Sequence, residues 1–111
     1  MTMRQEDTVN LRPRSRWADD ASCRTHDIVL FFGTEKRPLL GVADAEPGMR
    51  ICKACPVRRD CLLDSLLTQE WVGLRGGFLG AERRRSLSRN GTVAAAMAAY
   101  DAGTFTGSRR G

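Results

Sequence analysis

The sequence has no long apolar run, and nothing in its 111 residues approaches the roughly 20 consecutive apolar residues that a membrane-spanning helix requires. Near the N-terminus, no charged segment is followed by an apolar stretch, so the pattern of a secretory leader is missing as well. The chain also has no internal repeat and no long low-complexity tract. We therefore expect one cytoplasmic domain with no membrane partner.

Apolar periodicity is also scarce, because much of the chain is Arg, Gly, Ser or Thr. A domain of this size can bury only a modest core, so something besides hydrophobic packing should help to stabilise the fold. The four cysteines are the candidates. Cytoplasmic thiols stay reduced, and there they bind metals or carry redox chemistry more often than they form structural disulfides.

The net charge of +5 belongs mainly to the C-terminal end. Residues 1–81 carry 12 Lys and Arg against 11 Asp and Glu, whereas residues 82–111 carry 6 Arg against 2 acids. Such an end suits an anionic partner, and each Arg that neutralises a DNA phosphate adds to the salt sensitivity of binding. The alternative is a solvated helix face, which charge runs usually form. The candidate DNA contacts are Arg83, Arg84, Arg85 and Arg89.

Local patterns predict a mostly α-helical domain with about four short helices. Residues 1–16 lack periodic apolar positions and should form a mobile tail. A short helix is expected within 21–32, followed by a surface loop over 33–48, where glycine and proline recur. The strongest helical spacing begins at Pro56, which suits the first position of a helix, and continues to about residue 69.

The rest of the chain is predicted to form a turn and two more helices. Three glycines within residues 73–77 indicate a turn. Residues 81–87 are compatible with a helix, and Thr92 can cap a last helix that ends near Gly103. One face of that helix carries Val93, Met97 and Tyr100, which form either a packing face or a contact face that becomes ordered on binding.

The cysteines combine one distant thiol with a tight group of three. The numbers of residues between successive cysteines are 28, 2 and 5 for Cys23, Cys52, Cys55 and Cys61. Clusters held by four thiolates commonly join a C-x2-C clip to ligands from elsewhere, and proline often follows the clip. A 4Fe-4S core with four thiolates is a net anion, so the N–H groups at the N-terminus of the following helix would stabilise it.

Two other interpretations use the same residues. Cys23-x2-His26 paired with Cys52-x2-Cys55 is a plausible zinc site, which would leave Cys61 as an ordinary buried thiol. Spacing alone does not separate zinc from the cluster, so a zinc-stabilised protein-binding adaptor stays open. A thiol–disulfide reductase is a weaker alternative, because the strand-then-helix context of that motif is missing.

Several features together resemble the WhiB-like family of actinobacterial and actinophage regulators. The resemblance covers about residues 17–85 and depends on the order and spacing of its parts. These are Trp17-x5-Cys23, the Phe31-Phe32 pair, the run Cys52-x2-Cys55-Pro56-Val57-x3-Cys61, and the turn Gly73-Leu74-Arg75-Gly76-Gly77 followed by an Arg-rich stretch.

The resemblance implies a small, irregular helical fold wrapped around one 4Fe-4S cluster per chain, with the four cysteines as ligands. It implies a transcription regulator that responds to redox state or nitric oxide and is not an enzyme. Cysteines freed by loss of the cluster can form disulfides. The implied partners are the C-terminal region of the primary sigma factor and promoter DNA, with no small-molecule substrate.

On this basis residues 17–81 form the cluster domain and residues 82–111 a basic extension that contacts DNA. Aromatic side chains should wall the cluster against solvent and oxygen, namely Trp17, Phe31, Phe32 and Trp71. The expected sigma-factor contacts are Trp71, Gly73, Leu74, Arg75, Gly76 and Gly77. The family usually has Trp at the centre of the turn, where this chain has Arg75, so either Trp71 takes over part of the contact or sigma binding is altered.

Overall fold

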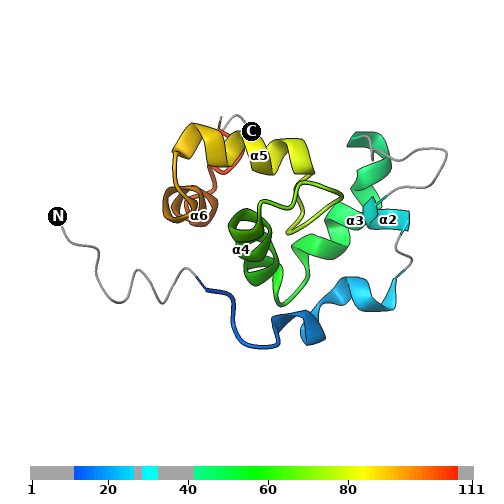
Figure 1. The fold of residues 1–111 in the computed structure, drawn as a ribbon. Coiled ribbons are helices and arrows are strands. Elements are labelled where there is room, and N and C mark those ends of the chain that lie inside the picture. The colour runs from blue at the N-terminus through cyan, green and yellow to red at the C-terminus, as the bar shows by residue number, and fades with distance from the viewer. Residues whose placement is uncertain (1–11, 27–28, 33–41, 108–111) are drawn as a thin grey trace.

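The computed structural model describes residues 12–26, 29–32 and 42–107, and short helices dominate them (Figure 1). Two 3-10 helices and five α-helices follow one another in the order η1 (Trp17–Asp20), η2 (Ser22–Thr25), α2 (Val29–Phe32), α3 (Val42–Lys53), α4 (Arg58–Thr68), α5 (Gly80–Asn90) and α6 (Val93–Asp101). The prediction of a small, mostly α-helical fold is confirmed. Within the described residues, no helix is long and apolar enough to cross a membrane.

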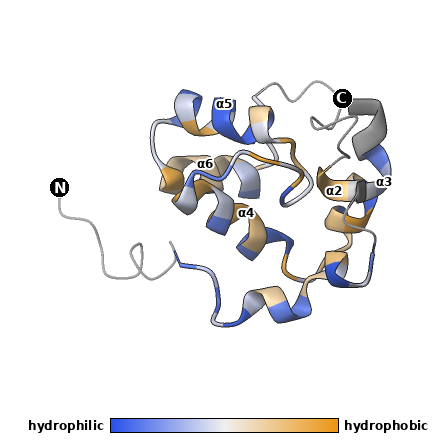
Figure 2. Cartoon of the chain, turned by 45° about the vertical axis from the view of Figure 1, so that its right-hand side comes forward, coloured by the Kyte–Doolittle hydropathy of each residue, from blue (hydrophilic) through white to orange (hydrophobic). Residues whose placement is uncertain are grey.

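The larger core is made where α5 and α6 pack on each other and on α4. Its buried members are Leu62, Leu63, Leu66, Ala96, Met97 and Phe105. The three residues that the sequence placed on one helix face all take part: Met97 is a buried member, and the partly buried Val93 and Tyr100 pack against the core. In Figure 2 the apolar α6 lies beside α5, which is largely hydrophilic.

Local chemistry explains why α5 and α6 begin where they do. The backbone N–H of Leu79 donates to the Glu82 carboxylate at 2.9 Å, which satisfies one free donor at the start of α5. At the start of α6 the Thr92 hydroxyl accepts from the backbone N–H of Ala95 at 3.1 Å, as the sequence predicted. Alanine then dominates α6, and alanine is the best helix former.

The expected boundary near residue 82 is wrong. Met97 and Phe105 are buried at 3% exposure each in the same core as Leu62 of α4. Arg59 of α4 also pairs with Asp101 at the end of α6, with both N–O distances at 3.0 Å. Residues 82–107 are therefore part of the packed domain, because their apolar side chains are buried against α4.

A second, smaller core joins the N-terminal helices to the glycine turn. Phe31 of α2, Cys52 of α3 and Leu74 of the turn are its buried members. Partly buried Met49, Ile51 and Leu79 pack against them. This core buries fewer apolar side chains than the larger core. Polar contacts must therefore contribute a larger share of the stability of this part of the domain.

The predicted loop over 33–48 is wrong in its second half, since α3 already begins at Val42; residues 33–41 lie outside the described part of the chain. Pro47 lies inside α3, where it removes one helical hydrogen bond. The helix persists because its C-terminal half packs on α2 and the turn. The single helix expected within 21–32 is instead divided into η2 and α2, and residues 27–28 between them lie outside the described residues.

The expected mobile tail is also shorter than predicted. Residues 1–11 lie outside the described residues, but Arg14 is bound to α4. Its backbone N–H and its Nε donate to the two carboxylate oxygens of Asp60 at 3.0 and 2.9 Å. Asp60 thereby holds the segment before η1 against α4.

The glycine turn has the backbone that the sequence predicted. Gly73, Gly76 and Gly77 have φ values of 73°, 62° and 86°, a region in which residues with a side chain are strained. Space is equally limiting, because a Cβ at Gly76 would lie 2.8 Å from the Cβ of Leu62. The turn closes with an antiparallel bridge between Arg75 and Phe78.

Arg83 holds this turn in place from inside the domain. Its side chain has 0% exposure, and its guanidinium donates to the backbone carbonyls of Glu70, Val72, Gly73 and Phe78. Burial lowers the pKa of Arg83 to about 10, with the nearby Arg75 as a further cause, so the group remains charged at neutral pH. The carbonyls solvate that charge where water cannot.

We expect the change Arg83→Met to lower the free energy of unfolding by about 2–3 kcal/mol, because the carbonyls would lose their buried donor. Denaturant unfolding followed by circular dichroism measures this. The matched control is Arg84→Met, one residue further along α5, where the side chain is exposed and a change within about 0.5 kcal/mol is expected. Equal losses in the two variants would contradict the role of Arg83.

Candidate metal centre

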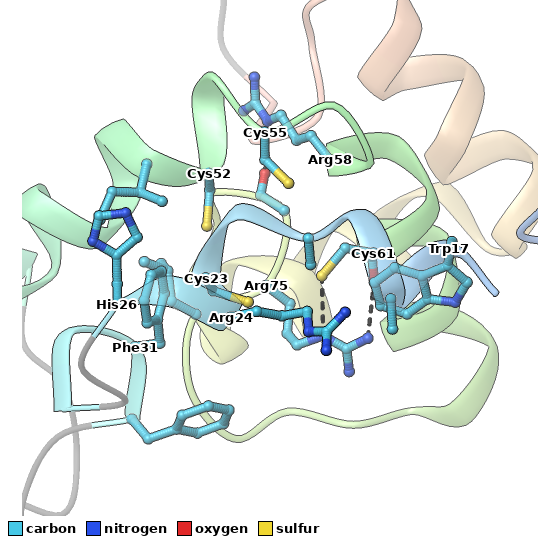
Figure 3. A pocket seen from close by; sticks show the side chains of 16 residues that line it. Trp17, Cys23, Arg24, His26, Phe31, Cys52, Cys55, Arg58, Cys61 and Arg75 are labelled. Carbon is cyan, nitrogen blue, oxygen red and sulfur yellow. Dashed lines mark hydrogen bonds between the residues drawn. The ribbon is translucent and has the colours of Figure 1, made fainter.

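All four cysteines line one cavity of about 460 Å³. Figure 3 shows their sulfur atoms on different sides of a common space. The volume falls within the range of small-ligand sites in proteins, so the cavity can hold a group of several atoms. The sequence placed these thiols together, and the fold brings them into one site.

Four different segments deliver the thiols. Cys23 belongs to η2, Cys52 lies near the end of α3, Cys55 follows in the turn before α4, and Cys61 lies in the first turns of α4. The turn between Cys52 and Cys55 is closed by a hydrogen bond from the backbone N–H of Cys55 to the carbonyl of Cys52 at 3.1 Å. Contact between η2 and α3 brings the distant Cys23 to the group.

Hydrogen-bond donors point at the sulfur atoms. The backbone N–H of Ser22 donates to Cys55 Sγ at 3.3 Å, and Arg75 Nε donates to Cys61 Sγ at 3.2 Å. Donors of this kind favour a thiolate over a neutral thiol. They are the contacts expected around sulfur that is bound to iron or another metal.

Burial has the opposite effect on the pKa of two of the thiols, because it favours the neutral form. Desolvation raises the pKa of Cys52 to about 11, although the backbone N–H of Gly77 partly offsets this. Burial also raises the pKa of Cys23, and the charges of Cys61 and Cys55 raise it further. Thiolates so close together repel one another, so a bound cation would be needed to keep all four ionised at neutral pH.

Positive and apolar side chains complete the cavity wall. Arg24, Arg58 and Arg75 line it, and all three can offset the negative charge of a thiolate-bound group. Of the four aromatic residues expected around the site, Trp17, Phe31 and Phe32 line it, together with Ala18, Ala21, Ile51 and Leu74. Such a lining limits the access of water to the sulfur atoms. The expectation is wrong for Trp71, which packs against the larger core instead.

The chemistry of the residues around the cavity fits a cluster of several metal ions. Four thiols with N–H donors and nearby guanidinium groups form a donor set for an anionic iron–sulfur group. His26, the fourth ligand of the zinc alternative, lines the same cavity. Among the described residues, no three or more His, Cys, Asp and Glu side chains are arranged to hold a single ion.

The residues expected to contact the sigma factor are buried or partly buried in the structure. Leu74, Gly76 and Gly77 are buried, and Gly73 and Arg75 are partly buried. Trp71 packs partly buried against the larger core. Val72, directly before the turn in the chain, is 61% exposed, and sequence reasoning missed it; Leu67, near the end of α4, is 44% exposed.

The four arginines expected to contact DNA differ in their exposure and in their partners. Arg84 and Arg85 are exposed on α5. The guanidinium of Arg89 donates to the carbonyl of Phe105 at 2.6 Å, so it helps to hold the C-terminal segment. Arg83 is corrected from a phosphate contact to an internal anchor, because it has no exposed surface. A hydrophobic-period analysis of α5 would have placed Arg83 on the same helix face as the buried Ser86.

Sequence reasoning missed Asp64, which lies next to the site. Its carboxylate accepts from Arg75 Nη2 at 2.8 Å. Burial alone would lower the pKa of Arg75, but the Cys61 sulfur and the Asp64 carboxylate raise it overall. The available signal was the i, i+3 spacing of Cys61 and Asp64 on one helix, which puts both side chains on one face.

Comparison with known proteins shows the family of the chain. The sequence profile of the family described as Transcription factor WhiB matches residues 17–86. Transcriptional regulator WhiB2 of Mycobacterium tuberculosis is 37% identical over 70 residues, which are 63% of this chain and 72% of the relative. WhiB4 of the same species is 30% identical over 86 residues, covering 78% and 67%. Transcriptional regulator WhiB of Streptomyces coelicolor is 36% identical over 69 residues, covering 62% and 72%.

In the metal-free chain, we expect Cys52 to be alkylated much more slowly than Cys23 at pH 7.5. Cys52 is 9% exposed whereas Cys23 is exposed, and a pKa of about 11 in place of 9.0 lowers the thiolate fraction about 100-fold. The rate at Cys52 should keep rising with pH up to about 11. Peptide mass spectrometry after timed iodoacetamide treatment measures both rates, and comparable rates at pH 7.5 would contradict the burial of Cys52.

Proposed function

The chain belongs to the WhiB family of transcription factors, and from this we propose that it regulates transcription through a 4Fe-4S cluster bound by Cys23, Cys52, Cys55 and Cys61. The observation that carries the proposal is the convergence of all four thiols on one cavity. The chain has no other cysteine, so every thiol is used by the site. Such a regulator acts by binding and has no catalytic turnover.

The residues around the cavity would protect the cluster from water and oxidants on most sides and leave one side accessible to them. When bound, the cluster supplies reactivity toward electrons, oxygen and nitric oxide. Trp17, Phe31 and Phe32 would restrict water and oxidants, while the exposure of Cys23 leaves one approach open. Loss of the cluster would free four neighbouring thiols, which could then pair as disulfides. Release of η2 from α3 would be the structural consequence, because Cys23 is its link to the site.

The two alternatives receive less support. A zinc-stabilised adaptor would use His26, which lines the cavity, but would leave the Arg75 donor to Cys61 without a role. A thiol–disulfide reductase needs a nucleophilic thiol with a lowered pKa, whereas the pKa of Cys52 in the C-x2-C pair is raised. We therefore keep zinc as the alternative to be tested directly.

We propose the C-terminal region of the primary sigma factor as the protein partner. Trp71 and the turn are the expected contacts, and the exposed Val72, directly before the turn in the chain, adds apolar area there. The buried members of the turn, such as Leu74 and Gly76, would act by shaping this surface. Promoter DNA would be contacted by the exposed Arg84 and Arg85 of α5, with Arg89 at its edge.

The chain purified without oxygen should be brown and carry about four iron and four sulfide per chain. Cys61→Ser should lose most of this iron, because the cluster needs all four thiolates. His26→Gln should keep it. Iron, sulfide and zinc analysis of the three proteins checks the proposal. A colourless protein with one zinc, retained in Cys61→Ser and lost in His26→Gln, would establish the zinc alternative instead.

Replacing both Arg84 and Arg85 with Gln should weaken DNA binding and reduce the slope of log K against log salt by up to about 2, since each phosphate contact adds about 0.9. The measurement is fluorescence anisotropy of a promoter-length duplex with the cluster-loaded protein and the sigma region. The control is Arg50→Gln, an exposed charge on α3, which should leave the slope unchanged. An equal loss in the control would mean that only net charge matters.

A further inference from the structure

Arg75 contacts a thiol of the cavity through a charged side chain. Its Nε donates to Cys61 Sγ at 3.2 Å, and its Nη2 lies 3.3 Å from the backbone carbonyl of Cys61. The dashed lines in Figure 3 mark these two bonds. Among the sulfur contacts of the described residues, this one has a charged donor, whereas Cys55 receives a neutral backbone N–H from Ser22.

The position of the guanidinium is held from several sides. Asp64 accepts from Nη2 at 2.8 Å, and the Trp17 ring lies below the guanidinium carbon at 5.7 Å. The Arg75 side chain is only 16% exposed, so water screens its charge weakly. Its backbone is fixed in the bridge to Phe78, within a turn that Arg83 holds. The charge therefore stays beside Cys61 without reorganisation of the protein.

We propose that Arg75 is a positioning residue that raises the reduction potential of the cluster through Cys61. This inference rests on the proposed function, because it needs the cluster. One-electron reduction by a chemical reductant such as dithionite makes the core and its thiolates more negative. A fixed positive charge with a hydrogen bond to one sulfur stabilises that reduced state more than the oxidised state.

Asp64 gives the proposal a second, opposite test. Its carboxylate orients Arg75, yet its negative charge opposes reduction at the same thiolate. Removing the charge of Arg75 should therefore lower the potential, while removing the charge of Asp64 should raise it. A purely structural role for the pair would move both variants in the same direction or leave both unchanged.

The test uses the full chain, loaded with its cluster under anaerobic conditions, in a redox titration followed by electron paramagnetic resonance. We expect Arg75→Gln to shift the reduction equilibrium at least tenfold toward the oxidised state, which is 59 mV for one electron. Arg75→Lys should recover part of this shift, because it restores the charge without the Nε donor. Resonance Raman spectra should show a stronger iron–thiolate bond in Arg75→Gln, since a hydrogen bond to that sulfur is lost.

Arg24→Gln is the matched control. Arg24 lines the same cavity, but its side chain is 58% exposed and donates to the carbonyl of Asp19 rather than to a sulfur. Its loss should shift the potential clearly less than the loss of Arg75 does. Equal shifts would overturn the inference, because unspecific charge near the cavity would then explain them.

The outcomes separate this inference from the proposed function. A wild-type chain without iron and sulfide would defeat the proposed function itself. A loaded wild type with an unchanged potential in Arg75→Gln would overturn only the role of Arg75. If Arg75→Gln does not retain the cluster, Arg75→Lys decides, because it keeps the charge but removes the Nε donor to Cys61: a lowered potential supports the inference, and an unchanged or raised potential overturns it.

Discussion

The buried guanidinium of Arg83 and the glycine turn that it binds form the contact on which the rest of the domain depends. By donating to carbonyls on both sides of the turn, Arg83 fixes the path of residues 70–78 between the two cores. Leu74 then reaches the smaller core, where its N–H donates to the Phe31 carbonyl at 2.8 Å. Without an internal cation, a glycine-rich segment of this kind would have too few apolar contacts to hold one conformation.

The same turn joins the packing of the domain to the chemistry of the cavity. Gly76 lies against Leu62 of the larger core, while the neighbouring Arg75 contacts Cys61. A change in the ligand state of Cys61 would therefore act on the turn directly. The surface beside the turn, including the exposed Val72, is the one that we propose for a protein partner. Cluster state and partner binding would then be coupled through a contiguous set of contacts.

Some errors in prediction came from contacts that no local pattern contains. Six Arg among the last 30 residues predict a basic extension, yet Met97 and Phe105 bury their side chains against α4. Pro47 indicated a loop, but α3 continues through it because Ile51 and Cys52 gain apolar contacts beyond it. In both cases tertiary packing outweighs a composition signal.

Local patterns were enough to predict the thiol ligands, the glycine turn, a helix after Pro56 and the cap at Thr92, because each depends on neighbours in the chain or on the chemistry of one residue type. Family membership followed from the order of these motifs. Contacts between distant segments place Arg83 inside the domain, put Arg75 beside Cys61 and Asp64, and pack residues 82–107 against α4. An arginine has the same charge on the surface and inside a domain, and only the surrounding acceptors decide where it is stable.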